Sequence, residues 1–164
     1  MLSVRVSSVA VPVLALTVLA CAQALTAEAD WQKSYPVSGK PSLTVSTGDA
    51  STEVRACTGC REVRIRVEWN DRHPDDYTLN EFQSADHVNF ELKEKQHFGI
   101  HIGMARHEPR VFVDTPAEVD LEARTSDGAL NVSGLNGNLD LHTSDGAVDV
   151  SDISGAVRLV ASDG

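Results

Sequence analysis

Apolar and polar positions alternate along much of the chain, and in the last third this alternation has a fixed period of nine residues. Each unit contains a glycine that is followed two and four places later by apolar residues. The glycines with these apolar followers are Gly128, Gly137, Gly146 and Gly155, and Gly164 continues the same spacing. Alternation with a period of two predicts short strands that bury one face and expose the other.

The turns alternate in sequence, so the true repeat is eighteen residues. Three of the glycines close a Ser-Asp-Gly triplet, at 126–128, 144–146 and 162–164, whereas Gly137 and Gly155 do not. A repeat this short cannot bury its own apolar face, so copies must stack into one continuous core. The pattern predicts an all-β fold: a β-solenoid, like a parallel β-helix, with 18-residue coils built from two 9-residue units. We expect about five strand residues and four turn residues in each unit, with glycine supplying the positive φ of a tight corner.

The pattern divides the chain into three regions. Residues 1–29 form an N-terminal targeting segment, residues 30–115 an irregular strand-rich part of the solenoid domain, and residues 116–164 the regular repeat. We interpret Ser46–Val67 as an early, degenerate copy of the repeat. The strands predicted in the irregular part are Ser42–Ser46, Glu53–Ala56, Glu62–Trp69, His87–Lys93, His97–Met104 and Arg110–Asp114.

The regular region stops at a corner, Ser162–Gly164, whose following strand is absent from the sequence. A solenoid ordinarily closes with a unit that shields its last apolar rung. We therefore expect the repeat to be incomplete at its C-terminus. An exposed final strand also favours end-to-end self-association.

The first 29 residues have the composition of a secretory signal peptide. Arg5 precedes an apolar run, Val9–Ala20, and small residues then occur with cleavage-site spacing at Ala22–Ala24 and Ala27–Ala29. The run is shorter than the roughly 20 residues that span a bilayer. The alternative is a lipoprotein signal with the lipid on Cys21. Both readings place the mature chain in the periplasm or outside the cell, with membrane attachment only if Cys21 is lipidated.

An oxidising compartment gives the pair Cys57 and Cys60 a structural interpretation. Two cysteines separated by Thr58-Gly59 predict a short-loop disulfide. The flanking strands predict a hairpin tip at this turn. A redox-active pair would need a helix N-terminus, and zinc would need a second pair of ligands at a usual spacing.

The net charge of −10 argues against two classes of partner. Nucleic acids require clustered Lys and Arg, and an anionic membrane surface requires a basic patch. The acidic turns instead make calcium a candidate ligand. Stacking would place Asp127, Asp145 and Asp163 about 5 Å apart on successive coils. These aspartates precede their glycines and no Gly-Gly pair occurs, so we expect solvated turns and only weak metal candidates.

Other residue types with catalytic or metal-binding chemistry have ordinary structural interpretations. His97 and His101 lie four residues apart on a predicted strand, about 13 Å from each other, which is too far to share one ion unless His107 or His87 folds back alongside. The serines fall at corners rather than in a nucleophile elbow. We expect no cofactor.

Carboxylate pairs for glycoside cleavage could be drawn from Asp140, Asp149 and Asp152. Solenoid enzymes that act on polysaccharides usually have loop insertions that build a cleft. The eighteen-residue units contain no insertion that could house such a site. We therefore expect that the chain is not an enzyme.

The repeat region resembles a known family. The similarity lies in Val111–Pro116, in Leu121–Gly128 and in the related segment Leu141–Gly146. These segments resemble the bacterial putative-adhesin family, whose members are largely of unknown function. The resemblance is strong over 110–164 and weak over 40–110. It implies an exported N-terminus and a run of β-coils, and it brings no catalytic residues.

These observations lead to a hypothesis about function. We expect a non-enzymatic binding or scaffold protein of the cell envelope or the secreted fraction, adhesin-like, with a protein or glycan as its ligand. The alternatives are a carbohydrate-active solenoid enzyme that uses surface carboxylates, and a calcium-binding repeat protein.

Overall fold

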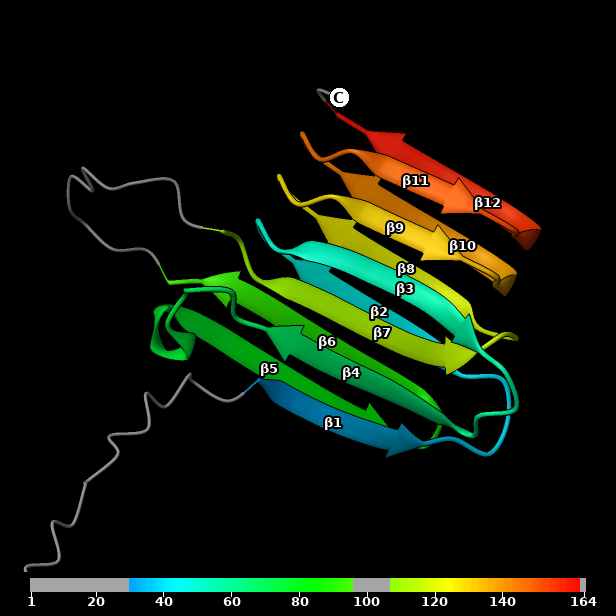
Figure 1. Ribbon diagram of the computed structural model, residues 1–164. Coiled ribbons are helices and arrows are strands. Elements are labelled where there is room, and N and C mark those ends of the chain that lie inside the picture. The colour runs from blue at the N-terminus through cyan, green and yellow to red at the C-terminus, as the bar shows by residue number, and fades with distance from the viewer. Residues whose placement is uncertain (1–29, 96–106, 163–164) are drawn as a thin grey trace, which may run out of the picture.

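The computed structural model describes residues 30–95 and 107–162, and this part of the chain is all-β (Figure 1). The strands in these ranges are β1 (Trp31–Pro36), β2 (Ser42–Thr47), β3 (Ser51–Cys57), β4 (Glu62–Glu68), β5 (Tyr77–Ser84), β6 (His87–Glu94), β7 (Arg110–Pro116), β8 (Asp120–Thr125), β9 (Leu130–Ser133), β10 (Asn136–Thr143), β11 (Val148–Ser151) and β12 (Ser154–Ala161). A short 3-10 helix, η1 (Pro74–Asp76), precedes β5.

The strands form two six-stranded mixed sheets that pack face to face. The first sheet has the order β1-β4-β7-β3-β9-β11, and the second has the order β12-β10-β8-β2-β6-β5. The parallel strands of the first sheet (β7, β3, β9 and β11) point one way, and those of the second sheet (β12, β10, β8, β2 and β6) point the opposite way (Figure 1). These strands are called the parallel stack. The chain therefore crosses from one sheet to the other at each corner of the repeat region.

The eighteen-residue period of the sequence is the pairing offset of the parallel strands. Leu121 of β8 pairs with Leu139 of β10, which pairs with Val157 of β12. In the first sheet, Val132 of β9 pairs with Val150 of β11. Equivalent residues of successive repeats therefore lie side by side, and every second residue along each strand points into the space between the sheets.

The segment β2–β3 belongs to the same stack, whereas β4 does not. β2 pairs in parallel with β8, and β3 pairs in parallel with β9. The interpretation of Ser46–Val67 as an early repeat is therefore correct for β2 and β3 and wrong for β4, which runs antiparallel to both β7 and β1.

The expected hairpin at Thr58-Gly59 is also wrong. β7 lies between β3 and β4 and pairs with both, so the turn connects two strands that are not neighbours. The reason is that β7 continues the parallel stack from β3, with Val111 and Val113 fully buried, and this displaces β4 by one position.

The core fills the space between the two sheets with aliphatic side chains and few aromatic rings. Fully buried residues include Val54, Val63, Ile65, Phe90, Val113, Leu130 and Leu141. The predicted strands over 42–69, 87–93 and 110–114 match observed strands within two residues at each end. The predicted strand His97–Met104 lies outside the described residues. Alternation of apolar and polar positions was thus a reliable guide wherever a strand has one buried face.

β1 and β5 were not predicted from the sequence. Both are edge strands that pair antiparallel with their neighbours, β1 with β4 and β5 with β6. Their sequences are mostly polar, since they cover one end of the stack and are themselves half exposed.

The periodic glycines are required by close packing of successive repeats rather than by corner geometry alone. A Cβ atom at Gly128 would lie 2.1 Å from the carbonyl oxygen of Ala50, and one at Gly146 would lie 2.1 Å from the carbonyl oxygen of Gly128. Equivalent contacts of 1.9 and 2.2 Å would arise at Gly137 and Gly155. Real Cβ atoms do not approach a carbonyl oxygen this closely, so each glycine leaves room for the backbone of the preceding coil.

The sequence pattern predicted glycines with positive φ at tight corners and strands of about five residues, and both predictions are wrong. Gly128 and Gly146 are not among the described glycines with positive φ. Gly137 and Gly155 lie inside β10 and β12, not at corners. The repeat therefore alternates strands of four and eight residues instead of strands of five.

Gly146→Ala should lower the free energy of unfolding by about 1–3 kcal/mol, because the added methyl group overpacks the contact with the coil below. Gly48→Ala is the matched control, since a Cβ atom there meets nothing within 4 Å. The control should change stability by no more than about 0.5 kcal/mol. Urea unfolding measures both, and equal effects of the two substitutions would refute the stacking argument.

Candidate functional site

The outer face of the second sheet presents its polar side chains in rows that run across the strands. One row joins His142 of β10, Arg124 of β8, Ser46 of β2 and Glu91 of β6, which are paired in register. The short side chain of Ser46 lies between the longer ones of its neighbours. The surface is therefore hollowed along the end of β2.

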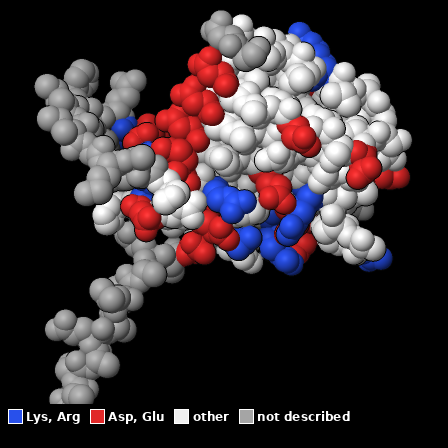
Figure 2. Space-filling model, turned by 45° about the horizontal axis from the view of Figure 1, so that its top comes forward, with Lys and Arg blue, Asp and Glu red and all other residues white. Residues whose placement is uncertain are grey.

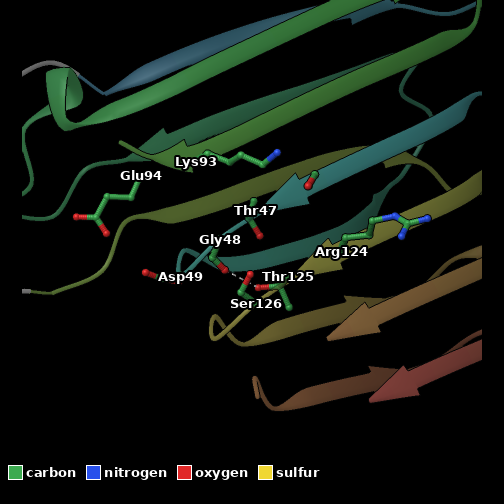
Figure 3. A pocket seen from close by; sticks show the side chains of 9 residues that line it. Thr47, Gly48, Asp49, Lys93, Glu94, Arg124, Thr125 and Ser126 are labelled. Carbon is green, nitrogen blue, oxygen red and sulfur yellow. Dashed lines mark hydrogen bonds between the residues drawn. The ribbon is translucent and has the colours of Figure 1, made fainter. Parts of the chain in front are cut away.

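This hollow is a groove of about 320 Å³ where β2, β6 and β8 end. Its lining residues are Ser46, Thr47, Gly48, Asp49, Lys93, Glu94, Arg124, Thr125 and Ser126. Lys93 and Arg124 come from the strands on either side of β2. Figure 3 shows their charged ends extending to one side, while the carboxylates of Asp49 and Glu94 point to the other side.

Hydrogen bonds between neighbouring coils hold the floor of the groove. The Thr125 hydroxyl donates to the carbonyl oxygen of Gly48 at 3.0 Å and lies 3.1 Å from that of Gly128. The Ser126 amide donates to the same Gly48 carbonyl at 3.0 Å (Figure 3). Buried threonines at the ends of β2, β8 and β10 (Thr47, Thr125 and Thr143) repeat at this position. The floor is therefore a fixed part of the stack.

The two cations of the groove are paired with carboxylates of their own strands. Lys93 forms an ion pair with Glu91, and Arg124 forms one with Glu122. The hydrogen bond from Lys93, and secondly that from Asn80, lowers the pKa of Glu91. Lys93 and Arg124 are each more than half exposed. Exposed ion pairs of this kind contribute about 0–1 kcal/mol, so an incoming anion can replace the internal carboxylate at little cost.

The metal candidates lie along one edge of the molecule. Asp127 and Asp145 are exposed and sit at equivalent corners of neighbouring coils, and Asp49 occupies the same place in the β2–β3 corner. Figure 2 shows a line of acidic side chains along this edge. Asp163 lies outside the described residues. Within 30–95 and 107–162, no three His, Cys, Asp or Glu side chains are grouped closely enough to hold a metal ion.

The other predicted residues are dispersed. Asp140 lies on the outer face of the second sheet, where Arg158 and His142 contact it, whereas Asp149 lies on the outer face of the first sheet. These two carboxylates therefore cannot flank one substrate bond. Asp152 occupies the turn between β11 and β12 with a φ of 54°.

The histidine candidates do not meet either. His87 contacts the hydroxyl of Ser42, and His107 is exposed beside Asp71. His97 and His101 lie outside the described residues.

Cys57 and Cys60 lie at disulfide-bonding distance, with their Cα atoms 5.8 Å apart. They border a second hollow of about 270 Å³ on the outer face of the first sheet, which Arg55 and Arg64 also line. The proposed signal segment and Cys21 are outside the described residues.

Sequence reasoning missed a polar cluster that closes the β1–β5 end of the stack. Lys33 of β1 contacts Glu81 of β5 at 2.5 Å, and the Tyr35 hydroxyl donates to the other Glu81 oxygen at 3.1 Å. The hydrogen bond from Lys33 has the largest effect and lowers the pKa of Glu81. Burial, the second-largest effect, opposes it, and the hydrogen bond from Tyr35 lowers the pKa further. Burial, with the charge of Glu81, raises the pKa of Tyr35. The alternating polar and aromatic residues of Trp31–Pro36 were the only sequence signal.

Searches against known proteins identify no family for the chain. No family model matches it, and no curated protein matches it. Among solved structures, it is similar to the crystal structure of a putative cell adhesion protein from Clostridium sporogenes. The sequence identity is 6% and the TM-score is 0.43, over 81% of this chain and 98% of that chain. A similarity this low carries no argument about function. Over the described residues, no helix has the length and apolar composition needed to cross a bilayer.

The Lys33–Glu81–Tyr35 cluster should make stability depend on pH in the acidic range. Because the pKa of Glu81 is lower in the folded chain, its stabilisation is complete above the unfolded value of 4.5 and is lost as pH falls through the folded value. Glu81→Gln should therefore show a smaller loss of unfolding free energy between pH 5 and 3, measured by urea denaturation. Glu118→Gln, at an exposed site away from this cluster, should behave like the unaltered chain. An unchanged profile in Glu81→Gln would contradict the assignment.

Proposed function

We propose that the chain is an exported, non-enzymatic binding or scaffold protein of adhesin-like type, built as a β-solenoid. The pairing of β8, β10 and β12 at a constant eighteen-residue offset supports the solenoid architecture. The same offset recurs in β9 and β11 of the facing sheet. Repeated coils of this kind give a long, rigid face whose outward residues are free to vary without disturbing the core.

The groove between Lys93 and Arg124 carries the proposal, because it combines two exposed cations with a floor fixed by hydrogen bonds. The hydroxyl groups of Ser46 and Ser126, which also line the groove, can exchange hydrogen bonds with a ligand rich in hydroxyls. Asp49 and Glu94 add acceptors at the opposite rim. An acidic glycan requires cations that pair with its carboxylates, and hydrogen-bond donors and acceptors for its hydroxyls. We therefore propose a uronic-acid glycan as the ligand class.

The cysteine pair supports the proposed location. Disulfides persist in oxidising compartments and are rare in the cytosol. A bonded Cys57–Cys60 pair suggests the cell envelope or the extracellular space, in agreement with the proposed signal segment.

Binding of polygalacturonic acid oligosaccharides to the full chain tests the proposal. We expect saturable binding by calorimetry, without product formation, and about fivefold weaker binding by Arg124→Gln, which corresponds to the loss of about 1 kcal/mol from one exposed charge pair. The fully methyl-esterified oligosaccharides, which lack the carboxylate charges, should not bind.

Arg64→Gln is the matched control for Arg124→Gln. Both arginines are about half exposed, and each pairs with the glutamate two residues before it, but Arg64 lies on the first sheet. The control should bind normally. Cleavage of the glycan would overturn the non-enzymatic assignment. Equal binding of the charged and esterified glycans, or no binding of either, would overturn the proposed ligand class.

A further inference from the structure

The cysteine pair Cys57–Cys60 lies at a turn that the strands around it already hold in place. The pair joins residues three apart in the sequence, and the shortest loops gain the least stability from closure. β3, before the turn, pairs with β7, and β4, after it, pairs with β7 and β1 (Figure 1). The Val37 amide also donates to the carbonyl oxygen of Arg61 at 2.9 Å. Both ends of the turn are therefore fixed without the sulfur–sulfur bond.

The pair is open to solvent from two sides. Cys57 and Cys60 border the hollow of about 270 Å³ on the outer face of the first sheet, and Cys60 also borders a second hollow of about 580 Å³. Thr58 and Gly59 are exposed, and a Cβ atom at Gly59 would meet nothing within 4 Å. No other part of the described chain thus covers the tip of the turn, and a thiol in solution can reach Cys60 from either hollow.

The charges around the pair have an excess of positive sign, although the net charge of the chain is −10. Arg55 and Arg64 line the smaller hollow, and Arg61 lines the larger one. Two carboxylates, Asp114 and Glu62, also line the smaller hollow, and they are paired with Arg55 and Arg64 respectively. Arg61 is exposed, and no carboxylate of residues 30–95 or 107–162 is paired with it. The hollows therefore hold three arginines against two carboxylates.

Positive charge beside a cysteine favours its thiolate, which is the form that leaves and attacks in thiol–disulfide exchange. A third carboxylate, Glu53, contacts Arg55 at 3.6 Å but lines neither hollow. The sequence pattern suggested that a redox-active pair would need a helix N-terminus. Here the arginines supply the positive charge in its place. An exposed disulfide in such surroundings is typical of labile pairs rather than of structural ones.

We propose that Cys57–Cys60 is a thiol–disulfide exchange site that takes two electrons from a protein dithiol. A thiolate of the dithiol attacks Sγ of Cys60, the Cys57–Cys60 bond breaks, and Cys57 leaves as a thiolate. The second thiol of the dithiol then loses its proton, attacks the mixed disulfide and releases Cys60. The dithiol is oxidised to a disulfide, the pair is reduced to two thiols, and the two protons that the dithiol loses balance those that the cysteines take up.

The surroundings of the two sulfurs assign these roles. Cys60 borders both hollows and follows the exposed tip of the turn, so it is the more accessible target, and Arg61 beside it attracts an incoming thiolate. Cys57 ends β3 and faces only the hollow that contains Arg55 and Arg64, which stabilise it as the leaving thiolate. The proposal requires that the pair is bonded. It does not depend on the glycan ligand, because the groove lies on the other sheet.

Equilibration of the folded full chain with reduced and oxidised glutathione tests the proposal. Cys21→Ser is used so that only the pair can react, and maleimide labelling followed by intact mass gives the reduced fraction. We expect millimolar glutathione to reduce the pair, whereas structural disulfides resist the glutathione pool. The reduced chain should still unfold cooperatively on heating. Peptide mapping of acid-quenched samples should find the mixed disulfide with glutathione on Cys60.

Arginine variants test the role of charge. Arg55→Gln and Arg64→Gln should each slow reduction of the pair by dithiothreitol at pH 7 about threefold, as expected for loss of one exposed charge. About 1 M salt should abolish the difference from the unaltered chain, because it screens exposed charges. Arg158→Gln is the control, since it also removes an exposed arginine paired with an aspartate, but on the second sheet. It should react at the unaltered rate.

Three results would overturn the proposal. The first is a pair that stays oxidised at every glutathione ratio and reacts with dithiothreitol only after the chain is unfolded, which would make the bond purely structural. The second is an equal reduction rate in Arg55→Gln, Arg64→Gln and Arg158→Gln, each shown to be folded by cooperative thermal unfolding. The third is glutathione trapped mainly on Cys57, which would reverse the assigned roles.

Discussion

The close approach of the backbone of one repeat to that of the next is the constraint on which the rest of the structure depends. At Gly128, Gly137, Gly146 and Gly155, a carbonyl oxygen of the preceding coil occupies the place where a side chain would begin. This contact fixes the register of both sheets at once, because a shift by one residue would bring a side chain against that oxygen. The buried threonines reinforce the register through hydrogen bonds to carbonyls of the same and neighbouring coils. Polar and charged residues on the outer faces are consequently held in rows.

Register in turn positions the groove. Lys93, Ser46 and Arg124 are far apart in the sequence, and they become neighbours because β2 lies between β6 and β8. The floor of the groove belongs to the same hydrogen-bonded stack that sets the register. A ligand would therefore meet cations whose strands are already fixed, and only the flexible ends of two side chains would need to adjust on binding.

The regular region could be predicted from the sequence because each of its strands contacts a copy of itself eighteen residues away. The period, the buried positions and the cysteine pair all follow from local patterns. The order of the strands could not be predicted in the same way, since β6 and β7 follow β2 and β3 in the chain, yet β6 lies beside β2 and β7 beside β3 on the side away from the repeat region. The groove was missed for that reason, and the polar cluster of Lys33, Tyr35 and Glu81 was missed because antiparallel edge strands carry no repeat.

The eighteen-residue pairing has a consequence for how such a chain can change in length. Strands of one repeat pair with the equivalent strands of the repeats before and after it, and the register of each pairing is the same. Duplication or deletion of one whole repeat would preserve every register and leave both ends unaltered, whereas a change by any other number of residues would misplace the glycines. The gene should therefore tolerate gain or loss of whole repeats. Each gained or lost repeat changes the length of the stack by one strand spacing, about 4.8 Å, and selection can act on that length.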